Sequence, residues 1–164
     1  MPWDRGAGAD TTATAIRACL HAIYSRHEVL ERLRIEIDEL YTAHSGIGNV
    51  KYLQFKKLPY LTAVIREAMR LNPSIPFQLL RYAPPGGLVV DGKYIPPDTP
   101  VGISPLVQNR EAAIWGKDAD EFQPDRWLDP AHFRYLDAND MTFGGNGPRM
   151  CIGRNIALVG FGGT

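Results

Sequence analysis

The stretch FGGNGPRMCIGR, Phe143 to Arg154, places a single cysteine among four glycines and a proline near the end of the chain. Cys19 is the only other cysteine, and it lies far upstream in a stretch with helical periodicity. This spacing indicates neither a disulfide framework nor a C-x-x-C metal site. The chemistry of Cys151 must therefore be explained from its own loop.

Two interpretations of Cys151 are open from the loop alone. A lone cysteine can bind haem iron as a thiolate, and glycines without a Cβ atom let backbone N–H groups approach the sulfur. Arg149, two positions earlier, favours this interpretation because a guanidinium group can pair with a haem propionate. The alternative is a buried structural thiol in a tight turn. The loop matches neither the G-x-G-x-x-G nor the G-x-x-x-x-G-K-[ST] phosphate-binding motif.

The composition is that of a folded domain with no overall charge preference. The chain has 164 residues, of which 45% are hydrophobic, and its 18 basic residues balance its 18 acidic ones. Disorder is therefore not expected, and nothing in the net charge indicates binding to nucleic acid or to an anionic membrane surface. No apolar run reaches the roughly 18 residues of a membrane-spanning helix, and the first 25 residues lack a signal-peptide pattern.

Hydrophobic periodicity divides the chain into a helical first half and a mixed second half. Apolar residues at helical spacing predict helices from about residue 9 to 24, over 27–41, and from Pro59 to the Asn72-Pro73 stop. Asp91-Gly92 between the runs LVV and KYI predicts a two-residue hairpin. We further expect a short helix near 108–113, packed coil over 115–140 and a helix after Cys151. The predicted fold class is mainly α with small β-sheets.

Glu67 and Arg70 form an E-x-x-R pair on the helix that begins at Pro59. Residues three apart share a helix face, and apolar residues surround this pair. A buried pair would need further partners to offset its desolvation, and Arg126 in FQPDRW is a candidate. The alternative is an exposed helical pair that adds a few tenths of a kcal/mol to stability.

The stretch AGADTT, Ala7 to Thr12, combines small residues with Asp10 and Thr11. Small residues let a flat ligand lie close to a helix backbone, while the carboxylate and hydroxyl could relay protons through water. The alternative is a capping region at a helix N-terminus, where aspartate and threonine are common.

Taken together, these motifs resemble the cytochrome P450 family. In order, AGADTT, E-x-x-R, F-x-P-x-R-W and G-x-R-x-C-x-G are similar to the distal helix, the K helix, the meander and the cysteine-ligand loop of that family. The sequence between these motifs is similar to that of fungal microsomal members related to pisatin demethylase, in the stretches LPYLTAVIREAMRLNPSIPFQLLRYAPPGG and DADEFQPDRWLD. The resemblance covers nearly the whole chain.

The resemblance implies a role for each motif. Cys151 would be the axial thiolate ligand of haem b, and Arg149 and Arg81 would bind the haem propionates. Asp10 and Thr11 would deliver protons on the opposite face of the ring. The triad Glu67, Arg70 and Arg126 would lock helix, meander and loop together. The other positions implied in haem binding are Gly8, Phe143, Gly147 and Gly153; Phe143 lies eight positions before Cys151, one more than in the family pattern.

The resemblance also implies a reaction and its partners. The family inserts one oxygen atom into an organic substrate, here expected to be small and apolar, with electrons from NADPH through cytochrome P450 reductase. Residues 1–164 would form a partial haem domain, truncated at both ends of the P450 fold, with weak haem retention and no independent activity. The alternatives are a non-catalytic haem-thiolate binder and a haem-free structural remnant. Localisation stays open, although relatives are anchored to the endoplasmic reticulum.

Overall fold

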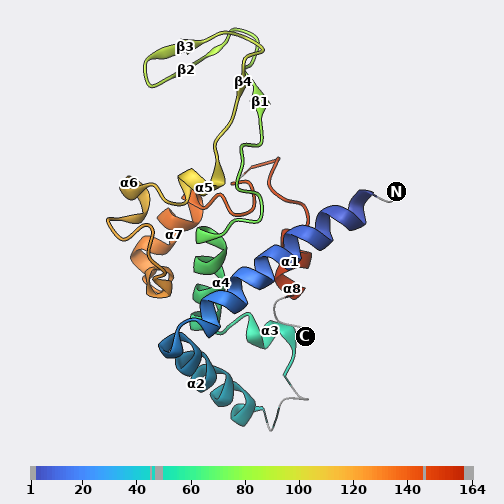
Figure 1. The fold of residues 1–164 in the computed structure, drawn as a ribbon, viewed down its shortest axis with the longest axis vertical. Coiled ribbons are helices and arrows are strands. Elements are labelled where there is room, and N and C mark those ends of the chain that lie inside the picture. The colour runs from blue at the N-terminus through green and yellow to red at the C-terminus, as the bar shows by residue number, and fades with distance from the viewer. Residues whose placement is uncertain (1–2, 45, 47–49, 146, 161–164) are drawn as a thin grey trace.

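The computed structural model describes residues 3–44, 46, 50–145 and 147–160. The three helices predicted for the first half are confirmed as α1 (Trp3–Tyr24), α2 (His27–Ala43) and α4 (Pro59–Leu71), and a short α3 (Tyr52–Phe55) precedes α4. The first helix begins earlier than predicted, because Gly6 and Gly8 do not prevent helix formation. In Figure 1, α1 crosses α4, and the two helices are packed against each other.

Helix α4 is the centre of the core. Its start follows from the extended backbone of Leu58 and from Pro59 in the first turn, and it ends at Asn72, directly before Pro73. Three clusters of buried apolar side chains surround it, and α4 contributes to each of them. The α4 residues in these clusters are Tyr60, Ala63, Val64, Ala68 and Met69.

Two small antiparallel ladders project away from the helices, at the top of Figure 1. Strand β1 (Arg81–Tyr82) pairs with β4 (Pro100–Val101), and β2 (Leu88–Val90) pairs with β3 (Lys93–Ile95). The predicted hairpin is confirmed, since Asp91 and Gly92 have φ values of 49° and 72°, as a turn with positive φ at both central residues requires. The sheets are minor elements of a mainly helical fold.

The second half contains more helix than predicted. A single short helix was expected near 108–113. This prediction is wrong, because two short helices, α5 (Pro105–Gln108) and α6 (Ala112–Trp115), lie there with a break between them. The coil expected over 115–140 is also wrong, because it contains the 3₁₀ helix η2 (Pro124–Trp127) and α7 (Pro130–Asn139). Asp129 caps α7 by accepting a hydrogen bond from the Ala131 N–H group at 2.9 Å.

The helix expected after Cys151 is confirmed as α8 (Arg154–Gly160), which lies against α1. Within the described ranges, no helix has both the length and the apolar character needed to cross a membrane.

Candidate functional site

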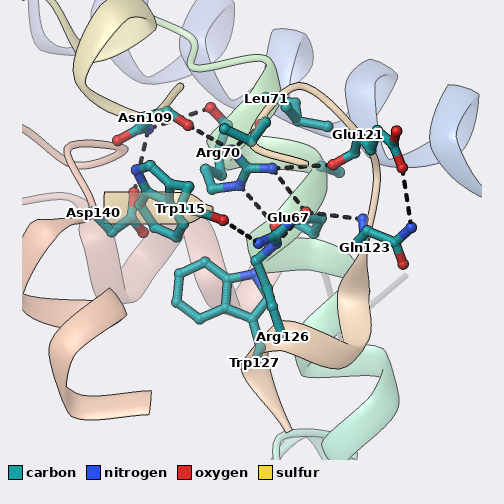
Figure 2. Close-up of polar contacts among 12 residues, drawn as sticks. Glu67, Arg70, Leu71, Asn109, Trp115, Glu121, Gln123, Arg126, Trp127 and Asp140 are labelled. Atoms are coloured by element: carbon teal, nitrogen blue, oxygen red, sulfur yellow. Dashed lines mark hydrogen bonds and ion pairs between the residues drawn. The ribbon is translucent and has the colours of Figure 1, made fainter. Parts of the chain in front are cut away.

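A buried carboxylate organises the contact between α4 and η2. Glu67 and Arg70 have fully buried side chains, and Arg126 from η2 is nearly buried. The two oxygens of Glu67 accept five hydrogen bonds of 2.8–2.9 Å, from Arg70 (two), Arg126, the Trp127 indole and the Gln123 backbone. Figure 2 shows the carboxylate at the centre of these donors. The alternative of an exposed Glu67–Arg70 pair is therefore wrong.

Both guanidinium groups also bind backbone carbonyls between residues 109 and 121. Arg70 donates to the carbonyl oxygens of Asn109 at 2.5 Å, Ala119 at 2.7 Å and Glu121 at 3.2 Å. Arg126 donates to those of Trp115 at 2.7 Å and Asp118 at 3.1 Å. A buried charge pair is tolerable only when such hydrogen bonds satisfy its remaining polar groups. The structure thus joins Glu67, Arg70 and Arg126 in one network that fixes the irregular segment before η2.

Sequence reasoning missed some members of this network. The indole N–H group of Trp127 needs a hydrogen-bond partner once it is buried, so its place next to Arg126 was a usable signal. The backbone N–H group of Gln123 and the carbonyl of Asn109 carry no such signal, because any residue type supplies these groups.

Backbone hydrogen bonds and a left-handed glycine shape the cysteine loop. The Cys151 N–H group donates to the Phe143 carbonyl, and the Gly144 N–H group donates to the Met141 carbonyl, both at 2.9 Å. Gly145 has φ = 77°, and a Cβ atom added there would lie 2.8 Å from the Met141 sulfur. Only glycine suits this turn without strain or displacement of Met141. The loop therefore holds Cys151 through its own main chain.

The two cysteines occupy opposite environments. Cys151 is exposed, whereas Cys19 is 5% exposed in the cluster between α1 and α4. Burial raises the pKa of the Cys19 thiol to about 12, which makes it a poor metal ligand at neutral pH. The alternative of a buried structural thiol describes Cys19 and is wrong for Cys151. In the part of the chain that the structure describes, no cluster of three or more histidine, cysteine or acidic side chains could hold a metal ion.

The predicted propionate ligands lie on exposed segments around the loop. Arg149 and Arg81 are both exposed, and Arg81 donates to the carbonyl oxygens of Leu79 at 3.1 Å and Leu80 at 2.9 Å. A Cβ atom added at Gly144 would lie 3.9 Å from both the Leu79 Cδ1 atom and the Arg149 carbonyl oxygen. The segment that leads into β1 thus approaches the cysteine loop, and Leu79, Leu80 and Ile152 are exposed apolar side chains there.

The remaining loop residues divide between core and surface. Phe143 packs against the cluster of α1 and α4 that contains Cys19, and the Arg154 guanidinium lies 5.5 Å from its ring centroid. Its side chain therefore anchors the start of the loop in the core. Gly147 is exposed with φ = 110°, and a Cβ atom at Gly153 would lie 3.8 Å from the Cys151 sulfur.

Gly8, Asp10 and Thr11 lie inside α1. Because α1 begins at Trp3, the alternative of a capping region for Asp10 and Thr11 is wrong. Asp10 is exposed and Thr11 is half-buried, and the Thr11 carbonyl accepts a hydrogen bond of 2.7 Å from the Ser74 hydroxyl. Among the described residues, no atom lies within 4 Å of a Cβ atom built at Gly8. This stretch of helix therefore presents an open surface.

Comparisons with known proteins agree with these motifs. The family model described as Cytochrome P450 matches residues 5–161. Pisatin demethylase of Fusarium vanettenii is 39% identical over 94% of this chain and 29% of its own length. Cytochrome P450 monooxygenase cfoH of Aspergillus candidus is 40% identical over 93% of this chain and 30% of its own length. The chain thus spans about three-tenths of the length of these relatives.

Proposed function

Because the chain belongs to the cytochrome P450 family, we propose that it forms the haem-thiolate part of a monooxygenase, in which Cys151 would bind the haem iron. The observation that carries this proposal is the exposed thiol of Cys151 on a loop fixed by its own backbone, beside exposed guanidinium and apolar groups. A structural thiol would gain nothing from exposure, whereas an iron ligand requires it.

The residues present fit a haem group. The exposed sulfur of Cys151 would bind the iron. Arg149 and Arg81 would bind the propionates, since neither forms an ion pair with an acidic side chain among the described residues. Leu79 and Ile152 offer apolar contacts to the ring. When bound through a thiolate, haem supplies the chemistry of O–O bond cleavage, which electron donation from the sulfur favours.

The protein's own residues would position this chemistry and supply its protons. In this proposal, Glu67, Arg70 and Arg126 hold the segment on which the cysteine loop rests. On α1, the exposed Asp10 carboxylate takes protons from solvent, and the Thr11 hydroxyl passes them toward the site. The open surface around Gly8 leaves room for a flat ligand to lie close to the helix backbone.

The proposed substrate is a small apolar organic molecule, and the proposed electron source is NADPH through cytochrome P450 reductase. Both are carried over from what the family generally uses. Relatives named pisatin demethylase and cytochrome P450 monooxygenase support an organic substrate, and their names do not give the electron source. Residues 1–164 are proposed to be a partial haem domain of such an enzyme. No part of the proposal involves nucleic acid, in line with 18 basic and 18 acidic residues.

A carbon-monoxide spectrum tests the proposal. After addition of hemin, reduction and exposure to carbon monoxide, the chain should show the red-shifted Soret band of a thiolate-ligated haem. Cys151→Ala should abolish the band, and Cys19→Ala, which alters the buried cysteine, should retain it. A band that survives Cys151→Ala would refute the assignment of the ligand.

Turnover separates an enzyme from a binder. With reductase, NADPH and small apolar substrates, a monooxygenase should give product that Cys151→Ala eliminates. A red-shifted band without product would instead identify a non-catalytic haem-thiolate binder, and the absence of haem uptake would leave a haem-free structural remnant.

A further inference from the structure

A buried asparagine connects the Glu67 network to the cysteine loop. Asn109 is 0% exposed. Its backbone carbonyl accepts a 2.5 Å hydrogen bond from Arg70, and its side-chain N–H group donates at 3.3 Å to the Arg70 carbonyl. Its side-chain oxygen accepts a 2.9 Å hydrogen bond from the Met141 N–H group. Asn109 thus contacts both Arg70, near the end of α4, and Met141, two residues after the end of α7.

Asp140 holds the same turn from the other side. Its Oδ1 atom accepts hydrogen bonds from the Thr142 N–H group at 2.9 Å and from the Thr142 hydroxyl at 2.5 Å. The Asn109 side-chain N–H group donates to that oxygen at 3.4 Å, and Figure 2 shows Asn109 beside both Arg70 and Asp140. The backbone at 140–142 is therefore held by two polar side chains, the buried Asn109 and the half-buried Asp140.

The contacts continue from this turn to the sulfur. The Met141 N–H group binds Asn109, and the Met141 carbonyl accepts from the Gly144 N–H group at 2.9 Å. Phe143 directly precedes Gly144, and its carbonyl accepts a 2.9 Å hydrogen bond from the Cys151 N–H group. A continuous series of hydrogen bonds and short backbone segments thus runs from Arg70 to Cys151.

We propose that Asn109 is a positioning residue for Cys151, through which the Glu67–Arg70 pair sets the place of the cysteine loop. The position requires an acceptor for the Met141 N–H group and a donor for the Arg70 carbonyl and Asp140, and a neutral side-chain amide supplies both. Alanine supplies neither, and aspartate would place a second carboxylate against Asp140. The consequence for haem binding rests on the function proposed above.

Amide hydrogen exchange without haem tests the positioning directly. In Asn109→Ala, the amide protons of Met141, Gly144 and Cys151 should exchange about tenfold faster or more, because the half-buried Met141 donor loses its acceptor. Leu33→Ala is the matched control, since it removes buried volume between α2 and α4 away from the loop. Unchanged exchange at Gly144 and Cys151, or equal acceleration in both variants, would overturn the proposal.

Asn109→Asp gives a second test if Asn109→Ala does not fold. Two carboxylates at the 3.4 Å contact cannot both stay ionised without repulsion, so the loop should open at neutral pH and regain protection when the pair binds a proton at lower pH. Arg70 faces Asn109, and Arg66 and Asp137 act on Asp140. These charges are the same in the unaltered chain, where Asp140 titrates without a second carboxylate beside it, so protection of its loop should depend on pH much less. The exchange rates are divided by the intrinsic rate at each pH to give protection factors. Protection factors of the loop that depend on pH no more in Asn109→Asp than in the unaltered chain would contradict the proposal.

Hemin titration links the positioning to the site. Loss of a residue that orients a metal ligand commonly weakens metal affinity about 10–100-fold, and Asn109→Ala should weaken hemin binding by that factor while Leu33→Ala does not. Equal hemin affinity in Asn109→Ala and the unaltered chain would overturn this part of the inference. If the unaltered chain binds no hemin, the proposed function fails, and the exchange data alone still decide the role of Asn109.

Discussion

The Glu67 network and the cysteine loop differ in what they leave exposed. Glu67 and Arg70 are 0% exposed, and the carboxylate accepts five hydrogen bonds. In the loop, Cys151 and Ile152 are exposed, and the hydrogen bonds around the sulfur come from the main chain. The comparison teaches that buried charges here build a closed support, whereas main-chain hydrogen bonds hold Cys151 with its thiol exposed.

The two regions should therefore respond differently to substitution. A buried ion depends on every partner, because an uncompensated charge in the interior is strongly unfavourable. An exposed side chain on a loop contributes little to folding, so its replacement should alter binding and leave stability almost unchanged. The predictions below test this division.

Glu67→Gln should give the largest loss of stability. It removes the negative charge between the buried guanidinium groups of Arg70 and Arg126, and breaking such a pair typically costs about 3–5 kcal/mol. Urea unfolding measures the change. The control is Asp125→Asn, which breaks the exposed 2.8 Å pair with Arg32 and should cost about 0–1 kcal/mol. Similar losses in both variants would show that burial does not distinguish the two pairs.

Trp127→Phe should give an intermediate loss. The aromatic ring stays in the core, but the 2.9 Å hydrogen bond from the indole to the Glu67 carboxylate disappears, and hydrogen bonds to charged groups contribute about 1.5–3 kcal/mol. Trp115→Phe is the matched control, because it loses a 3.0 Å hydrogen bond to the neutral Gln108 carbonyl, worth about 0.5–1.5 kcal/mol. A smaller loss for Trp127→Phe than for Trp115→Phe in urea unfolding would argue against the dominance of the buried carboxylate.

Asp140→Asn should change the dependence of stability on pH. Burial raises the pKa of Asp140, against the hydrogen bonds from Thr142 and the charge of Arg66, which lower it. A raised native pKa gives stability that is complete below the unfolded pKa of about 3.9 and is lost as the pH rises through the native pKa. Asparagine does not titrate, so the variant should gain stability relative to the unaltered chain as the pH rises.

Urea unfolding of both proteins between about pH 4 and 7 measures this difference. The amide oxygen of an asparagine can still accept the two hydrogen bonds from Thr142, so the comparison isolates the charge. A difference in stability that stays constant over this range, or shifts in favour of the unaltered chain, would contradict the raised pKa.

Local sequence signals identified the elements whose residues allow only a few backbone conformations. Pro59 marks the start of α4, and Asp91-Gly92 marks the hairpin, because few conformations suit these residues. The Asp129-Pro130 start of α7 carried an equally readable capping signal, but it lies in the irregular stretch 115–140 that was interpreted as packed coil.

Burial was the quantity that local patterns could not supply. An E-x-x-R pair has the same spacing on an exposed helix as on a buried one, so the environment of Glu67 depends on the packing of η2 and the segment 109–121 against α4. The order of the four motifs identified the family and its candidate residues. It gave no indication that Asn109 contacts Met141, at the turn before the cysteine loop, since that contact joins residues 32 positions apart.

The central claim is that the Cys151 sulfur binds haem iron. The most direct test is whether bound hemin protects Cys151 from alkylation by iodoacetamide. Iodoacetamide should label Cys151 in the folded chain and spare Cys19, whose buried thiol has its pKa raised to about 12. Stoichiometric hemin should then block labelling of Cys151, as measured by mass spectrometry of the cysteine peptides. Equal labelling of Cys151 with and without hemin, under conditions in which hemin is bound, would contradict the assignment of this sulfur as the iron ligand.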